Sequence, residues 1–272
     1  TDPAIDGKTW PIFNPATRQV PTPTDLSFSG SLDGTFLIEL NENSPPPAVA
    51  LDSLSGASTV DPIVLKTNGK LPATTEEANL IPNQTVFLIP LKYASGDPIQ
   101  GLGNQEPPTV DAAQAATTSF KVDLVELDGN SAIRIVPTAP LAPNTRYVVG
   151  LTKDVKDASG EPLIQDPVYK NITAEDDPLI SSALAPIRSL TNRIWEPTVI
   201  GFAAQASDGQ LILKQDDIAL SYSFTTSNDV KVLKYIANPE IWLRDQLENF
   251  VKVSTAKKVA VSYTHLTLPT KR

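Results

Sequence analysis

The sequence contains no cysteine, no methionine and a single histidine among its 272 residues. Without cysteine, the chain can form no disulfide, no catalytic thiolate and no thiolate metal site. No run approaches the roughly 18 apolar residues that a membrane-spanning helix needs, and no signal peptide opens the chain. Because the chain starts at Thr1 without a methionine, we expect a processed protein or an interior fragment.

Clusters of basic residues are also missing. The formal net charge is -9, and the lysines and arginines do not gather into a patch that could neutralise a run of phosphates. We therefore expect no nucleic-acid partner. An acidic, cysteine-free composition is common in secreted bacterial proteins, although it is equally compatible with an ordinary soluble surface.

Proline is plentiful, with 25 residues, against 13 glycines. A proline inside a helix removes a backbone donor and clashes with the preceding turn, whereas edge strands and loops accept it. The composition therefore favours a mainly β fold over long helices. The length allows one large domain or two small ones.

Short segments rich in β-branched and apolar residues, separated by turn formers, predict the strands. These segments are 34–40, 59–66, 85–91, 120–127, 132–136, 145–152 and 218–226. The clearest hairpin joins 120–127 to 132–136 through Asp128-Gly129-Asn130. Strands at this spacing are typical of a two-sheet sandwich.

Helical periodicity occurs in two places. After Asp177-Pro178, apolar residues three or four apart predict a helix over 177–195, interrupted by Pro186 and ended before Pro197. After Asn238-Pro239, a similar pattern predicts a second helix.

One resemblance lies in the stretch 132–163. Val136-Pro137, Pro140-Leu141-Ala142-Pro143, Tyr147-Val148-Val149 and the turn Val155-Lys156-Asp157-Ala158-Ser159-Gly160 resemble bacterial Ig-like domains, which typically close on a strand ending in Phe-Thr-Thr. That ending occurs at Phe224-Thr225-Thr226. The resemblance implies an Ig-like β-sandwich of about 90 core residues from Asp61 onward, with a helical insertion.

A second resemblance covers most of the chain, to about Phe250. Its motifs are Asp2-Pro3-Ala4, 21–26 (PTPTDL), 29–35 (SGSLDGT) and 51–59 (LDSLSGAST). They resemble the N-terminal domain of bacterial virulence-factor lipases, which are secreted or surface-anchored enzymes that hydrolyse lipid esters. The resemblance implies a non-catalytic accessory region, at the bacterial surface or outside the cell, that precedes an α/β-hydrolase domain.

The expected organisation follows from these patterns. Residues 1–47 form an extended segment with a short hairpin, 48–226 form the sandwich with a helical insertion at about 171–215, and 227–256 form a helical linker towards the hydrolase domain. Residues 257–272 are expected to be an artefactual tail, because 261–272 (VSYTHLTLPTKR) resembles translated sequencing-adapter DNA. We expect the hydrolase domain to have followed about here.

A serine esterase needs a G-x-S-x-G turn with a histidine base, and this sequence has neither in usable form. The nearest imitation, 29–34 (SGSLDG), has the wrong glycine spacing and is better explained as a turn. The one histidine, His265, lies in the suspect tail. Lys66, Lys70 and Lys92 lack a Ser-x-x-Lys frame. We therefore expect no catalytic, cofactor-binding or metal-binding residues and no cofactor.

Acidic residues leave one alternative open. Asp154, Asp157 and Glu161 share one loop, and their carboxylates could act as calcium ligands or as a general acid and base. Their spacing departs from the calcium-loop pattern, so a solvated turn is the favoured interpretation. Asp176-Asp177 and Asp216-Asp217 are better explained as acidic residues before a helix and before a strand.

The two predicted helices also allow two interpretations. The helix with Trp195 either covers the sandwich or faces lipid, and covering is favoured. The helix with Trp242 and Phe250 is expected to dock on the missing hydrolase domain.

Three functions compete at this point. The first is an accessory domain of a lipase, whose partners would be the downstream hydrolase domain and a lipid or membrane surface. The second is an adhesin-like Ig module that binds or spaces. The third, and the least favoured, is a free-standing carboxylate enzyme.

Overall fold

The computed structural model describes residues 5–28, 56–98, 106–228, 236–241, 243, 244 and 247. The chain divides into two compact units, Thr1–Asn228 and Asp229–Arg272. In the second unit, residues 239–241, 243, 244 and 247 are helical, where the second helix is expected. The predicted strand at 34–40, Trp242, Phe250 and the tail lie outside the described residues.

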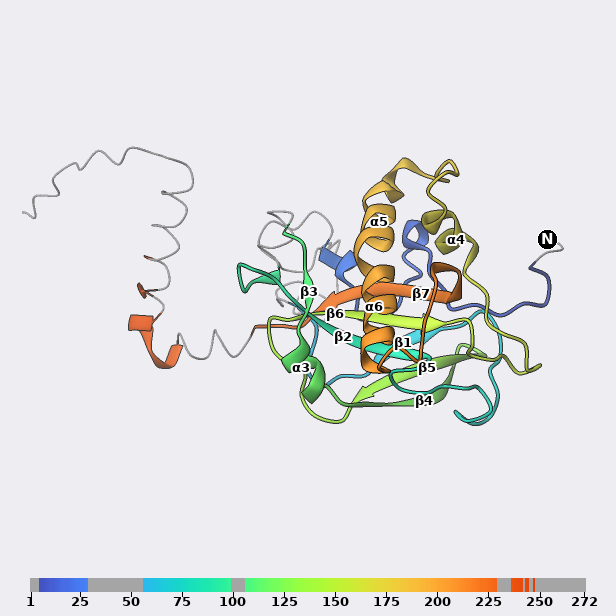
Figure 1. Cartoon of the computed structure of the whole chain (residues 1–272), viewed down its shortest axis with the longest axis horizontal. Helices are drawn as coiled ribbons and strands as arrows, with labels where there is room; N and C mark the ends of the chain where they lie inside the picture. The colour runs from blue at the N-terminus through green and yellow to red at the C-terminus, as the bar shows by residue number, and fades with distance from the viewer. Residues whose placement is uncertain are drawn as a thin grey trace, which may run out of the picture. The chain divides into compact units, whose positions relative to one another are not determined.

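The first unit contains two antiparallel sheets (Figure 1). One sheet has the order β1-β5-β4, and the other has the order β3-β2-β6-β7. The strands are β1 (Ile63–Lys66), β2 (Val86–Lys92), β3 (Thr109–Val110), β4 (Phe120–Leu127), β5 (Asn130–Pro137), β6 (Arg146–Thr152) and β7 (Ile218–Thr225). The two antiparallel sheets of the predicted sandwich are thus present. The expectation of a mainly β chain is wrong, because the structure contains about as much helix (28%) as strand (27%) and is therefore mixed α/β.

The β4–β5 hairpin confirms the strongest local prediction. Asp128 and Gly129 have φ values of 54° and 81°, which is the left-handed conformation that a two-residue hairpin turn demands. Leu127 therefore lies opposite Asn130. β7 pairs with β6 along its length, so the β pattern that resumes at Ile218 rejoins the earlier strands as expected.

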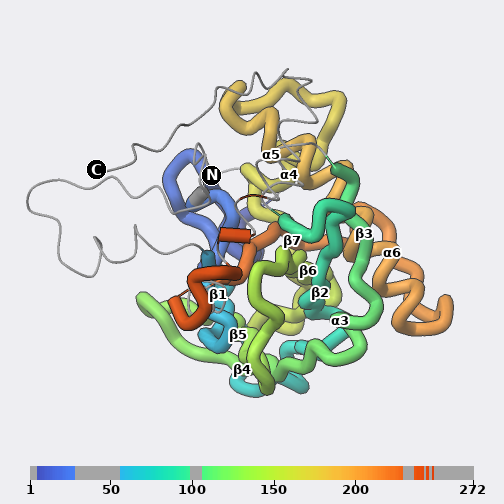
Figure 2. Tube along the Cα trace, turned by 90° about the vertical axis from the view of Figure 1, so that its left-hand side faces the viewer, coloured from blue at the N-terminus to red at the C-terminus, as the bar shows by residue number. Residues whose placement is uncertain are grey.

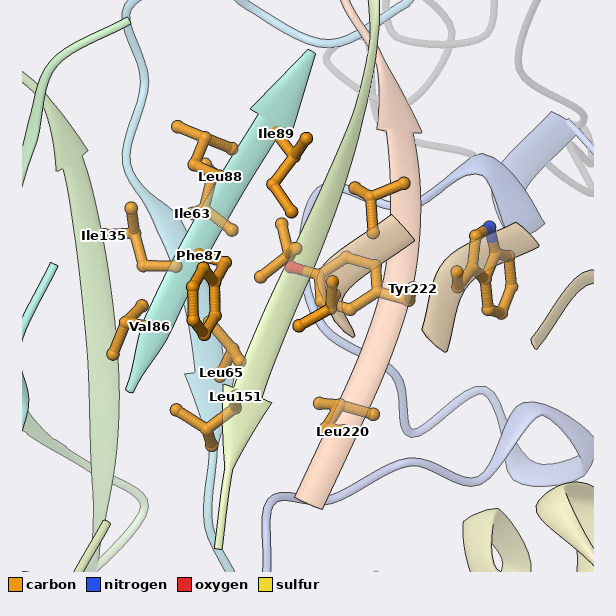
Figure 3. Close-up of a cluster of buried hydrophobic side chains, with 14 of the residues drawn as sticks. Ile63, Leu65, Val86, Phe87, Leu88, Ile89, Ile135, Leu151, Leu220 and Tyr222 are labelled. Carbon is orange, nitrogen blue, oxygen red and sulfur yellow. The ribbon is translucent and has the colours of Figure 1, made fainter. Parts of the chain in front are cut away.

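β2, β6 and β7 are buried on both faces, apart from Lys92 at the end of β2. Figure 3 shows their side chains in one cluster with those of β1 and β5, including Ile63, Leu88 and Tyr222. Helix α6 (Glu196–Ala206) contacts β2, β6 and β7 and lies across them in Figure 1. The strands of a sheet that is covered on both faces have continuous apolar runs in their sequences, and β2, β6 and β7 have such runs.

The helical insertion differs from its prediction. Among the described residues of the first unit, α3 (Ala112–Thr117) lies before the insertion. The helical elements of the insertion are α4 (Pro167–Thr173), the 3-10 turn η3 (Ser182–Leu184), α5 (Ala185–Leu190), the π-helical turn η4 (Thr191–Trp195) and α6. Short 3-10 turns also occur at η1 (Pro15–Thr17), η2 (Asp25–Phe28) and η5 (Gln215–Asp217).

The predicted boundaries of 177–195 are therefore wrong at both ends. The first helix begins at Pro167 because the Asp166 side chain accepts from the Val168 amide and caps it. The continuous helical run opens at η3 after Ser181, and it continues past Pro197. Pro197 is tolerated because it lies in the first turn of α6, directly after the wider π turn, where an amide donor is not needed.

The N-terminal segment completes the sheet that contains β1 (Figure 2). The Ile12 amide donates to the Lys66 carbonyl at 2.8 Å. Thr22 and Val64 exchange backbone hydrogen bonds of 3.2 and 2.8 Å. Two separate stretches of this segment therefore cover the outer edge of β1.

Candidate functional site

The loop that carries Asp154, Asp157 and Glu161 is organised around one carboxylate. Asp157 Oδ1 accepts from the Ser159 amide at 2.9 Å, the Ser159 hydroxyl at 2.6 Å and the Glu161 amide at 3.0 Å. Its Oδ2 accepts from the Thr9 hydroxyl at 3.2 Å. Burial alone would raise the pKa of Asp157, but these hydrogen bonds outweigh burial and lower it.

The same loop therefore has a structural explanation. The carboxylate of Asp157 stabilises the turn by accepting its hydrogen bonds, and it links the turn to the N-terminal segment through Thr9. Glu161 forms an exposed ion pair with Lys8 at 3.4 Å. Within the described ranges, no three acidic or histidine side chains gather in a way that could hold a metal ion. The turn interpretation fits these contacts, and they leave the calcium alternative without support.

Asp217 and two of the lysines have ordinary structural roles. Asp217 Oδ2 accepts from the Lys214 amide at 2.7 Å just before β7. Lys66 and Lys70 form exposed ion pairs with Asp128 and Glu126. Residues 29–34 and His265, the nearest imitations of esterase residues, lie outside the described part of the chain.

A buried polar cluster joins α4, α6 and β7. The Tyr169 hydroxyl donates to Glu196 Oε1 at 3.0 Å and accepts from the Ser221 amide at 3.0 Å. It also lies 2.7 Å from the Ser221 hydroxyl. All three side chains are at most 1% exposed, so no substrate in solution reaches this serine.

Glu196 supplies the carboxyl of this cluster, and burial perturbs its pKa. Burial, the largest cause, raises its pKa from 4.5 to about 7, while hydrogen bonds from Tyr169 and Gln215 and the charge of Lys153 lower it. Its Oε2 is buried without a hydrogen-bond partner. The cluster resembles an enzyme site in composition, but it lies in the interior, and its hydrogen bonds join α4 and α6 to β7.

A second buried cluster anchors the N-terminal segment. Arg146 Nε lies 2.8 Å from Asp25 Oδ2, and Arg146 Nη1 donates to the Tyr93 hydroxyl at 2.9 Å. The hydroxyls of Ser223 and Thr225 donate to the same carboxylate at 2.6 and 2.8 Å. Burial alone would lower the pKa of Arg146, and the charge of Asp25 with the Tyr93 hydroxyl raises it instead.

The helix with Trp195 covers the sandwich, as favoured. Trp195 is 2% exposed and belongs to the core cluster, and Ile187 and Leu190 pack against that cluster. No helix in the described part of the chain is long and apolar enough to cross a bilayer.

A hollow lies on the surface of the described part of the first unit. It has a volume of about 420 Å³ and lies between the N-terminal segment and the β4–β5 turn. Its lining includes Ile12, Arg18, Lys66 and Asn130. The sequence gives no signal for this hollow, because segments more than 100 residues apart form it.

Tyr147 supplies a further mark of the sandwich class. It lies near the start of β6, and its hydroxyl accepts from the Ala142 amide, five residues upstream, at 3.0 Å. This arrangement matches the tyrosine corner of Ig-like folds. Two antiparallel sheets, a hairpin register and this corner are features of Ig-like β-sandwiches, and the first unit combines them with helices.

Comparison with protein families agrees with this class. Residues 99–172 match the family described as Bacterial Ig-like domain. The match contains the whole stretch 132–163 on which the sequence resemblance rests, and the closing Phe-Thr-Thr lies beyond it. No curated protein and no solved structure matches the chain.

Proposed function

We propose that this chain is a non-catalytic Ig-like module that spaces or binds at the surface of a bacterium or outside the cell. The observation that carries the proposal is the Bacterial Ig-like match over residues 99–172, which contain β3 to β6 and so contribute strands to both antiparallel sheets. Domains of this family are typically structural or binding modules of secreted or cell-surface proteins.

The chemistry of the described residues supports the non-catalytic part of the proposal. The polar clusters around Glu196, Arg146 and Asp157 are buried, and their hydrogen bonds join separate elements of the fold. Each therefore has a structural role that does not depend on a substrate.

A surface-labelling experiment tests the location. An antibody against residues 56–228 should bind intact cells of the source bacterium, or its antigen should accumulate in the culture medium. A cytoplasmic protein labelled in parallel serves as the control for leakage. Antigen found only after lysis contradicts the proposal.

The second candidate is the accessory region of a lipase, and the motifs at 21–26, 29–35 and 51–59 favour it. The family match extends to the Ig-like part alone and lends the lipase no support. The discriminating observation is the genomic sequence downstream of this region. A G-x-S-x-G motif followed by an acid and a histidine within the next few hundred codons favours the lipase, with the hydrolase domain as partner. Their absence favours the free-standing module.

A further inference from the structure

The fold covers the backbone of two of its edge strands, β1 and β7. On β1, the outward groups of Val64 bond to Thr22, and the Lys66 carbonyl accepts from Ile12. On β7, the Ser221 amide donates to the Tyr169 hydroxyl, and the Thr225 carbonyl accepts from the Ala57 amide. Such covering prevents an edge from pairing with another chain.

The edge strand β4 (Phe120–Leu127) is different. Its two-residue turn and the bond from the Thr138 amide to the Ser119 carbonyl, 2.9 Å long, fix which of its residues bond to β5. These are the odd-numbered ones, because bonded and non-bonded pairs alternate along an antiparallel hairpin. The amides and carbonyls of Val122, Leu124 and Glu126 therefore point away from the sheet, and no described residue bonds to them.

The side chains of β4 leave this edge open. Val122 and Leu124 pack against the core, while Lys121 and Asp123 belong to the opposite face of the sheet. The strand is eight residues long and contains no proline or glycine, and its pairing with β5 has no bulge. The usual devices that blunt an edge, apart from charge, are thus missing. Figures 1 and 2 show β4 at the rim of the sheet, with no described strand beyond it.

The charged side chains of β4 indicate which kind of strand could pair with this edge. Asp123 is held by a bidentate pair with Arg134, with both bonds 2.7 Å long, and it is about one-third exposed. Lys121 is exposed on the same face, and none of the ion pairs between described residues includes it. One strand therefore carries an unpaired cation two residues from a fixed anion.

We propose that the outer edge of β4 is a self-association surface on which two copies of the chain pair antiparallel. Only even-numbered residues can exchange backbone bonds there, so few registers are possible. With Val122 opposite its own copy, Lys121 of each chain lies opposite Asp123 of the other, and two opposite-charge pairs form. The result is one six-stranded sheet with the order β1-β5-β4-β4-β5-β1.

Neighbouring registers lack this complementarity. A shift that centres the pairing on Asp123 places that carboxylate opposite itself. A shift that centres it on Leu124 places Asp123 opposite Val125 and Lys121 opposite Leu127. Lysine on an edge usually discourages pairing, but in the Val122-centred register it meets a carboxylate of the second copy. In this register, the charges of β4 are therefore complementary to those of a second, antiparallel copy of β4.

A concentration series of the full chain by sedimentation velocity tests the proposal. A single-strand contact is small, so we expect a reversible dimer with a Kd of about 10 μM to 1 mM. Lys121→Glu turns both attractive pairs into repulsive ones and should weaken the dimer about tenfold or more. Lys170→Glu is the matched control, because it makes the same charge change on the exposed surface of α4 and should leave the Kd within about twofold.

Thiol cross-linking tests the register, and the absence of native cysteine makes it unambiguous. A mixture of Lys121→Cys and Asp123→Cys chains should form a disulfide-linked heterodimer while one Lys121–Asp123 pair remains intact. Lys170→Cys in place of Lys121→Cys should not. A chain that stays monomeric up to about 1 mM overturns the proposal. So does a dimer that Lys121→Glu and Lys170→Glu affect equally, or one that gives no cross-link between positions 121 and 123. An extended segment of another protein that adds to β4 of a monomeric chain also overturns it.

Discussion

Replacement of Asp25 by alanine should destabilise the first unit strongly. Asp25 faces the buried guanidinium of Arg146, whose side chain is 7% exposed, and it accepts from the hydroxyls of Ser223 and Thr225. Removing one partner of a buried ion pair leaves an uncompensated charge and typically costs about 3–5 kcal/mol. Small domains have unfolding free energies of about 5–15 kcal/mol, so this loss is a large fraction of the total.

Urea unfolding followed by tryptophan fluorescence measures this loss. Asp123→Ala is the matched control, because it breaks an ion pair whose two side chains are both about one-third exposed, and it should cost much less than Asp25→Ala. Limited proteolysis should also cleave the N-terminal segment of Asp25→Ala faster, since Asp25 anchors it to β6 and β7. A loss below about 1 kcal/mol for Asp25→Ala, or equal losses for the two variants, contradicts the reasoning.

Two further substitutions test the interior. The pKa of Glu196 is raised to about 7, so the folded state binds more protons than the unfolded state between pH 4.5 and 7 and loses about 3 kcal/mol of stability as pH rises through that window. Glu196→Gln should remove this slope in urea unfolding between pH 4.5 and 8, and an unchanged slope contradicts the assignment. Gly150→Ala should cost about 1–3 kcal/mol, because its Cβ would lie 2.6 Å from a methyl of Val199. Val199→Ala in the same chain should relieve the clash, and strictly additive losses in the double variant would exclude that contact.

The strands of the sandwich could be predicted from the sequence because their signals are local. The hairpin is an example, because all its signals lie within twenty residues: the alternation over 120–127, the Asp128-Gly129 turn and the return strand. The structure contains this hairpin. The helical insertion was harder to predict. From the local sequence, Pro197 predicts that a helix ends there. The π turn that accommodates Pro197 depends on packing against the sandwich, which the local sequence does not reveal.

The candidate site could not be predicted from local signals. The bonds Arg146–Asp25 and Tyr169–Ser221 join residues more than 50 positions apart, and each of those residues has an ordinary local context. The open edge of β4 is also invisible in the sequence. It is defined by the absence of a described neighbour, whereas the equally ordinary strand β1 is covered by residues 12 and 22.

The proposed function is that of a structural or binding module without chemistry of its own. The most direct test is to incubate the purified chain with a fluorophosphonate serine probe and to map any adduct by mass spectrometry, with an active serine hydrolase as positive control. We expect no labelled serine and no cleavage of nitrophenyl esters, since an unassisted serine hydroxyl is a weak nucleophile and Ser221 is buried. Labelling at one serine that disappears when that serine is substituted contradicts it.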